Sequence, residues 1–216
     1  MPRAASLLVL LSLLVATPGL AQTQDVQAWE QLNLVIPVAS KLWVTLEEIA
    51  RTSDRQDGLY TTEFGVLLGY RVTNGVDLGF GYRHVGFYNG NTGADEERLR
   101  QQVIFTHGRF AGRLRLDERF NPRRSEIGFR IRPLFRYNLR LRPDHVVLFA
   151  SHESFILPNS TSWGQRAGYE RMRNNVGLAF PVRKAVSADV GYLNQYRPAR
   201  GGARGQMDHA LTCSSP

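Results

Sequence analysis

Cysteine and lysine are the residues this sequence has least of. Cys213 is the only cysteine, so a disulfide within the chain is excluded. Only Lys41 and Lys184 are lysines, and the other cations among the 27 basic residues are arginines. Arginine is favoured over lysine where charges are confined and forked onto carboxylates. The bias therefore predicts an enclosed ionic interior, with arginine-rich codon usage as the alternative explanation.

Long hydrophobic runs are absent after residue 21. Before that point, Arg3 precedes an apolar run from Ala4 to Ala16 and a small-residue tail, Gly19-Leu20-Ala21. This pattern is typical of a secretory signal peptide, and the run is too short for a membrane-spanning helix. We therefore expect residues 1–21 to be a signal peptide and residues 22–216 to form one exported domain. Export argues against nucleic acid as a partner, despite the net charge of +8.

Alternation of apolar and polar residues is the dominant pattern in the mature chain. From Ile127 to Arg142 it continues for sixteen positions, with arginine on the polar side, and only a β-strand gives that period meaning. A strand of this length exceeds the 9 to 11 residues that cross a bilayer. The same reading predicts ten strands and a candidate eleventh, at residues 29–36, 42–52, 59–72, 76–87, 98–107, 112–120, 127–141, 146–157, 169–180, 186–197 and 207–213.

Turn chemistry supports this series of strands. Asn74-Gly75 is a strong two-residue hairpin signal, and short connections alternate with long ones, such as residues 88–97 and 158–168. Outer-membrane barrels have short turns at one rim and long loops at the other. The prediction is an all-β, antiparallel up-and-down barrel of outer-membrane type. Parity is unresolved, because bacterial single-chain barrels have even strand numbers and a leading strand is unaccounted for, so we expect ten to twelve strands.

The polar faces of the strands carry charges of both signs, with arginine in excess. An enclosed surplus of cations must be neutralised by water, anions or a plug. Glycines on the same face leave room for long side chains. The predicted lumen-facing charge network consists of Glu47, Arg51, Glu63, Arg71, Asp77, Arg83, Arg98, Arg100, Arg113, Arg115, Asp117, Arg119, Arg130, Arg132, Arg136, Arg140, Glu153, Arg171, Arg173 and Asp189.

Catalytic and metal-binding patterns are weak. Ser151-His152-Glu153-Ser154 contains the members of a hydrolase triad, but neighbours on a strand point to opposite faces, so His152 does not meet Ser151 or Glu153. We therefore assign no catalytic residue and expect no enzyme; a triad assembled across strands, with His84, His107 or His209 as base, is kept as an alternative. The histidines show no paired metal-ligand spacing, so no metal or cofactor is predicted.

Several short motifs resemble those of the bacterial family catalogued as domain of unknown function 2490. They are Glu97-Arg98-Leu99-Arg100-Gln101-Gln102, residues 113–120 (RLRLDERF), Phe129-Arg130-Ile131-Arg132, Glu153-Ser154-Phe155 and Gly191-Tyr192-Leu193-Asn194-Gln195, and the resemblance extends from Trp29 to His209. It implies an exported outer-membrane-type barrel and no known activity. Family members finish in a full last strand, whereas this chain ends at residues 210–216 (ALTCSSP), so we expect a truncated C-terminal strand.

Three functional hypotheses remain open. The first is a structural or small anion-favouring barrel in the outer membrane, in contact with its lipid and delivered by the barrel-assembly machinery, with an anion or small-molecule ligand of unknown identity. The second is a lipid- or glycan-modifying enzyme in the same membrane. The third is a soluble periplasmic ligand-binding barrel, with apolar residues inside and arginines outside.

Overall fold

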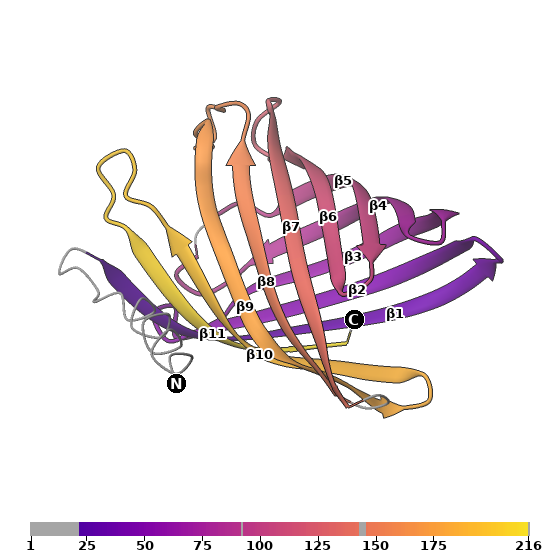
Figure 1. The fold of residues 1–216 in the computed structure, drawn as a ribbon. Helices are drawn as coiled ribbons and strands as arrows, with labels where there is room; N and C mark the ends of the chain where they lie inside the picture. The colour runs from indigo at the N-terminus through magenta and orange to yellow at the C-terminus, as the bar shows by residue number, and fades with distance from the viewer. Residues whose placement is uncertain (1–21, 92, 143–145, 216) are drawn as a thin grey trace, which may run out of the picture.

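The computed structural model describes residues 22–91, 93–142 and 146–215, and the predicted signal peptide lies outside these ranges. The described residues form a closed barrel of eleven strands (Figure 1). The strands are β1 (Thr23–Ala39), β2 (Leu42–Ser53), β3 (Gly58–Thr73), β4 (Val76–Phe87), β5 (Glu96–His107), β6 (Phe110–Phe120), β7 (Ile127–Arg142), β8 (Val146–Leu157), β9 (Gly168–Arg183), β10 (Val186–Arg197) and β11 (Gln206–Ser214). The prediction of an all-β barrel with ten to twelve strands is confirmed. No helix in the described part of the chain is long and apolar enough to cross a membrane.

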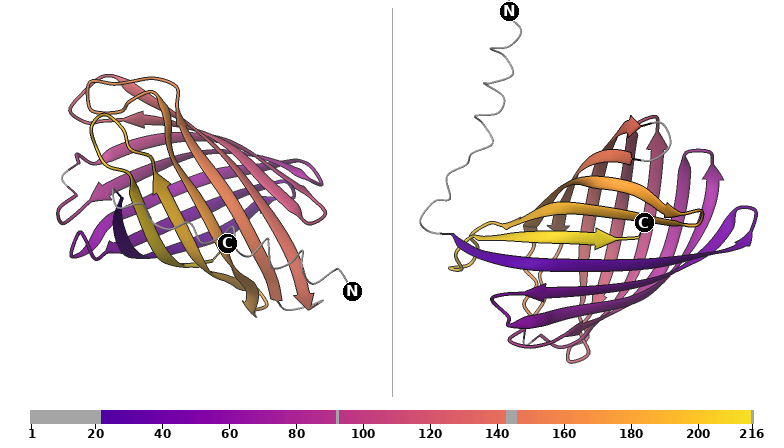
Figure 2. Two further views of the ribbon diagram at one scale, coloured as in Figure 1. Left: turned by 60° about the vertical axis from the view of Figure 1, so that its left-hand side comes forward. Right: turned by 90° about the horizontal axis from the view of Figure 1, so that it is seen from below.

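A parallel seam closes the barrel. Strands that follow one another in the sequence pair antiparallel around the barrel. β1 and β11 pair parallel and close it, from Thr23 opposite Gln206 to Gln31 opposite Ser214. Figure 2 shows these two strands, at opposite ends of the colour scale, lying side by side. When strand direction alternates, an odd number of strands leaves the first and last strands running the same way. The parity that the sequence left unresolved is therefore odd, and residues 23–28 form the start of β1 rather than a separate leading strand.

The two rims differ in the length of their connections. Two-residue turns join β1 to β2, β3 to β4, β5 to β6 and β9 to β10, whereas the connections at the other rim run up to the ten residues between β8 and β9. We call these the short-turn rim and the long-loop rim. Two long loops pack together at the latter: Trp163 Nε1 donates to the backbone carbonyl of Glu126 (3.0 Å), and the backbone N–H of Ser162 donates to the Glu126 carboxylate, which lowers the pKa of that group.

Inward and outward faces of the barrel differ sharply in chemistry. The buried side chains are mainly charged or amide groups, such as Arg100 and Asp117, and the apolar buried set is small. Large apolar side chains lie outside, for example Phe64, Phe80 and Leu114, each more than half exposed. The alternation in each strand therefore sorts charge to the interior and apolar surface to the exterior.

Glycine makes room for the charged interior. A Cβ atom at Gly65 on β3 would lie 3.0 Å from Glu47 Oε2 and 3.4 Å from Arg100 Nη2. Any larger side chain there would displace that ion pair, which explains why this position is glycine.

Candidate functional site: an arginine-rich lumen

Carboxylates in the middle of the barrel are each shared by several arginines. Glu47 on β2 forms ion pairs with Arg83, at 2.8 Å, and with Arg100. Glu63 on β3 forms ion pairs with Arg51 at 2.7 Å and with Arg83 at 2.6 Å. Side chains from four neighbouring strands, β2 to β5, thus form one network of ion pairs. The side chains of Glu47, Glu63 and Arg83 are all less than 10% exposed.

A second group of shared carboxylates lies on β6 and β8. Asp117 accepts from Arg130 at 2.8 Å and Arg132 at 3.4 Å. Glu153 lies 2.7 Å from Arg113, 3.0 Å from Arg132 and 3.9 Å from Arg173. Because one negative charge faces two or three guanidinium groups, this part of the interior carries a positive surplus.

The excess of positive charge is clearest at Arg115 and around Trp29. Arg115 is buried and donates to the amide oxygen of Gln102 at 2.9 Å, with no carboxylate within 4.0 Å among the described residues. The guanidinium carbons of Arg51 and Arg173 each lie 4.5 Å from the centre of a Trp29 ring. A ring face attracts cations, so Trp29 helps to hold two arginines close together where carboxylates are few.

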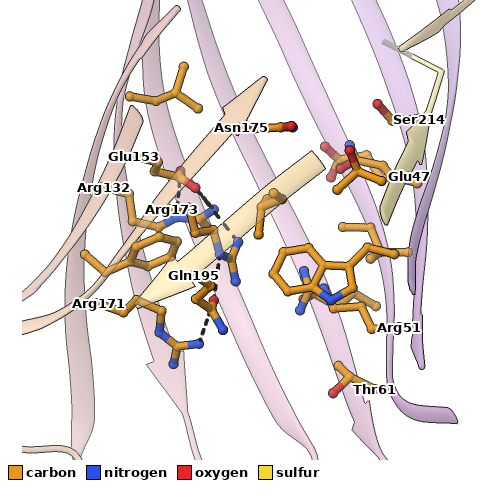
Figure 3. A pocket seen from close by; sticks show the side chains of 18 of the residues that line it. Glu47, Arg51, Thr61, Arg132, Glu153, Arg171, Arg173, Asn175, Gln195 and Ser214 are labelled. Atoms are coloured by element: carbon orange, nitrogen blue, oxygen red, sulfur yellow. Dashed lines mark hydrogen bonds and ion pairs between the residues drawn. The ribbon is translucent and has the colours of Figure 1, made fainter. Parts of the chain in front are cut away.

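These side chains surround a cavity of about 560 Å³ inside the barrel. Figure 3 shows Arg51 and Glu47 on one side of it, with Arg132, Glu153, Arg171 and Arg173 on the other. The Nε atoms of Arg51, Arg113 and Arg171 have no hydrogen-bond partner among the described residues, and the same holds for two acceptors at the cavity, Asn175 Oδ1 and Asp189 Oδ1. Buried donors and acceptors normally find partners, so the cavity suits water, and its excess of guanidinium groups suits anions.

The structure places most of the predicted network on the inner face. Arg98 and Arg119 both contact Glu96, the latter at 2.6 Å, and Arg136 lies 2.6 Å from Asp189. Arg171 pairs with Glu170 at 2.5 Å and reaches Gln195 at 3.4 Å. Three members lie apart: Arg71 and Asp77 form an exposed pair at 3.0 Å, and Arg140 is exposed.

Sequence reasoning missed five charged residues of the interior: Asp25, Glu96, Glu170, Arg197 and Asp208. Asp25 and Asp208 lie on the two seam strands, which the alternation pattern did not reveal clearly. Glu170 is the extra residue of a β-bulge, because Phe155 pairs with Arg171 and Ile156 with Tyr169. A bulge reverses the alternation locally and hides the inward position of such a residue.

The outer face of β8 and β9 carries a hydrogen-bonded polar group that the sequence analysis did not foresee. Ser151 lines the interior cavity and Glu153 is buried inside, so neither meets His152, as the strand argument requires. Ser154 shares the outer face with His152, however, and its Oγ lies 3.0 Å from His152 Nε2. Asn174 is opposite His152 in the register, with its Oδ1 2.7 Å from His152 Nδ1.

The other histidines named as alternative bases have different partners. His84 contacts Glu97 at 2.8 Å, and His209 contacts the Tyr192 hydroxyl at 2.5 Å. In the part of the chain that the structure describes, no group of three or more His, Cys, Asp or Glu residues is arranged to hold a metal ion.

The fold and interior define a closed β-barrel with an ionic lumen. A family profile described as protein of unknown function (DUF2490) matches residues 26–206, and the chain belongs to this family. An uncharacterised protein of Methylorubrum extorquens is 32% identical over 154 residues, which cover 67% of each chain. A solved structure from a report on the in-meso crystallisation of membrane proteins aligns with 85% of this chain and 79% of its own, at 14% identity and a TM-score of 0.43.

Proposed function

We propose that this protein is an outer-membrane β-barrel whose arginine-rich lumen holds small anions and favours their passage over that of cations. The observation that carries the proposal is the inverted distribution of chemistry, with shared carboxylates and surplus arginine inside and large apolar side chains outside. In a bilayer the outer face would contact acyl chains, and closure leaves few strand edges unpaired.

The extent of the apolar exterior favours a membrane over water. Exposed residues such as Leu32, Leu46, Phe80, Leu114 and Phe135 lie on five different strands, so the apolar surface runs round much of the barrel. Soluble monomers seldom expose contiguous apolar patches above a few hundred Å². The alternative of a soluble periplasmic carrier needs the opposite arrangement, with arginines outside and apolar residues lining the cavity.

Anions are the favoured solutes because twelve arginines but five carboxylate side chains line the cavity. Among the described residues, Arg115 has the amide of Gln102 as its hydrogen-bond partner and no carboxylate within 4.0 Å, and Arg113, Arg132 and Arg173 share Glu153. A lumen with this composition attracts negative ions and repels positive ones.

Two measurements test the proposal. In envelope fractions, the mature chain should sediment with outer membranes and migrate faster on a detergent gel before boiling than after; release by osmotic shock would contradict membrane placement. In planar bilayers under a KCl gradient, the reversal potential should indicate chloride preference, which Arg173→Gln should reduce. Conductance with cation preference, or no conductance, would contradict anion passage.

A further inference from the structure

A row of polar side chains crosses the outer face of the barrel. His152 on β8, Asn174 on β9, Asn194 on β10 and His209 on β11 are register neighbours. Next to them on the same face lie apolar residues, including Ala150, Val176 and Phe135. Polar groups on a surface that otherwise suits lipid are costly, and such groups are functional by default.

The hydrogen bonds within this row form a relay from serine to asparagine. Ser154 Oγ lies 3.0 Å from His152 Nε2, and His152 Nδ1 lies 2.7 Å from Asn174 Oδ1. The amide oxygen only accepts, so Nδ1 carries the proton and Nε2 is left to accept from the serine hydroxyl. This is the arrangement of nucleophile, base and orienting group that defines a catalytic triad on any fold.

We propose that Ser154, His152 and Asn174 form a serine hydrolase site on the outer face that cleaves the acyl esters of membrane phospholipids. Ser154 and His152 are the catalytic residues. Asn174 is a positioning residue, because it acts on the reaction only through His152.

The surroundings of Ser154 suit a lipid ester. Ser154 lies three residues from the end of β8 at the long-loop rim, roughly 10 Å along the strand. An outer groove of about 670 Å³ begins at His152 and Asn174 and extends toward the short-turn rim. Aromatic and apolar side chains line it: Phe105, Phe110, Phe135, Tyr137, Val176 and Tyr192. An ester near the rim would thus have its acyl chain lying in the groove.

The chemistry balances with water as the second reactant. Ser154 Oγ attacks the ester carbonyl carbon as His152 Nε2 takes its proton, and the bond from that carbon to the glycerol oxygen breaks as His152 protonates the leaving oxygen. Water then attacks the acyl-serine, giving its proton to His152, and Ser154 regains a proton as the fatty acid leaves. The products are a free fatty acid and a lysophospholipid.

Tyr169 supplies a donor near the reacting carbon. Its hydroxyl lies 3.2 Å from Ser154 Oγ, at the start of β9. Removing one donor to the developing oxyanion costs about 100- to 1000-fold in kcat in a well-studied hydrolase. Tyr169→Phe should therefore lower kcat within that range and keep the fold.

Covalent labelling tests the nucleophile without any variant. The full mature chain, refolded in non-ionic detergent, is treated with an alkyl fluorophosphonate, and the modified peptide is located by mass spectrometry. We expect one phosphonyl group on Ser154, with fluoride released, and no label once the barrel is unfolded. A folded barrel that takes no label, or takes it elsewhere, would overturn the proposal.

Hydrolysis in mixed micelles of detergent and palmitoyl-oleoyl-phosphatidylethanolamine tests the substrate. Ser154→Ala and His152→Ala should lower fatty-acid release by about ten-thousand-fold or more. Ser187→Ala is the matched control, because Ser187 is an exposed serine on β10 that lines neither the interior cavity nor the groove, and its rate should stay within twofold. Asn174→Ala should lower kcat with little change in KM, and Asn174→Asp should restore part of kcat and alter the pH profile.

The lipid substrate rests on the proposed membrane placement, but labelling of Ser154 does not. If Ser154 is labelled and the barrel is also released by osmotic shock, the triad is supported and the proposed membrane placement is refuted. Cleavage of short water-soluble esters alone, with no fatty acid from phospholipid, would refute the lipid assignment.

Discussion

Glu153 is the carboxylate on which the positive interior depends most. It is 6% exposed and faces Arg113, Arg132 and Arg173 at 2.7, 3.0 and 3.9 Å. In Glu153→Gln, Arg113 and Arg173 lose the one carboxylate within 4.0 Å among the described residues, while Arg132 keeps Asp117 at 3.4 Å. Breaking a buried ion pair by removing one partner costs about 3–5 kcal/mol.

We expect the lower part of that range, about 3 kcal/mol, because the cavity gives water access to Arg113. This corresponds to a change of roughly 150-fold in the unfolding equilibrium, since each 1.4 kcal/mol is about tenfold. The assay is urea unfolding of the barrel in lipid vesicles, followed by tryptophan fluorescence. Asp77→Asn is the control and should leave stability unchanged, because its partner Arg71 is exposed. A loss below about 1 kcal/mol in Glu153→Gln would refute the inference that Glu153 holds this cluster together.

The seam and the packing give two further predictions. Glu30→Cys should form a disulfide with Cys213, because the two residues are register partners on adjacent strands, whose spacing of about 4.8 Å suits the bond. Non-reducing electrophoresis should detect the closed loop, and Ala28→Cys, two residues out of register, should not cross-link; equal cross-linking of both would argue against the parallel seam. Gly65→Leu should lower the free energy of unfolding by about 1–3 kcal/mol, because its Cβ would lie 3.0 Å from both Glu47 Oε2 and the Tyr82 carbonyl. Unchanged stability would mean that the interior has room to spare at this position.

Most strand positions could be predicted because local chemistry decides them. Val76–Phe87, Val146–Leu157 and Val186–Arg197 have the predicted bounds. The first and third of these strands each follow a two-residue turn and alternate over most of their length. The predicted first strand began at Trp29, six residues late, because Asp25 and Gln27 face inward and the segment lacks an apolar run.

Long-range pairing could not be predicted in the same way. The parallel seam joins Thr23 to Gln206, and nothing local to either residue specifies that contact. The inward orientation of the charged side chains could be predicted from the alternation. The sharing of Glu153 by arginines from three strands depends on the register between strands and could not.

The hydrogen-bonded group on the outer face, Ser154, His152 and Asn174, could not be predicted from the sequence for a similar reason. His152 and Ser154 are two apart and could have been placed on one face from the sequence alone. Asn174 becomes their neighbour only through the register of β8 and β9, which includes a bulge at Glu170. A ten-residue loop separates these strands, and its sequence does not fix that register.

We propose that arginines face a shielded lumen while apolar side chains contact lipid, and two neighbouring residues allow this arrangement to be tested. Leu134 and Phe135 are neighbours on β7, the first lining the inner cavity and the second 60% exposed on the outer face. The decisive measurement places a single bimane label at each position, through Leu134→Cys and Phe135→Cys in a Cys213→Ser background, in vesicles containing brominated phospholipid. We expect strong quenching by brominated lipid at position 135 and little at position 134. Equal quenching at both positions, or quenching of position 135 only by a water-soluble agent, would contradict it.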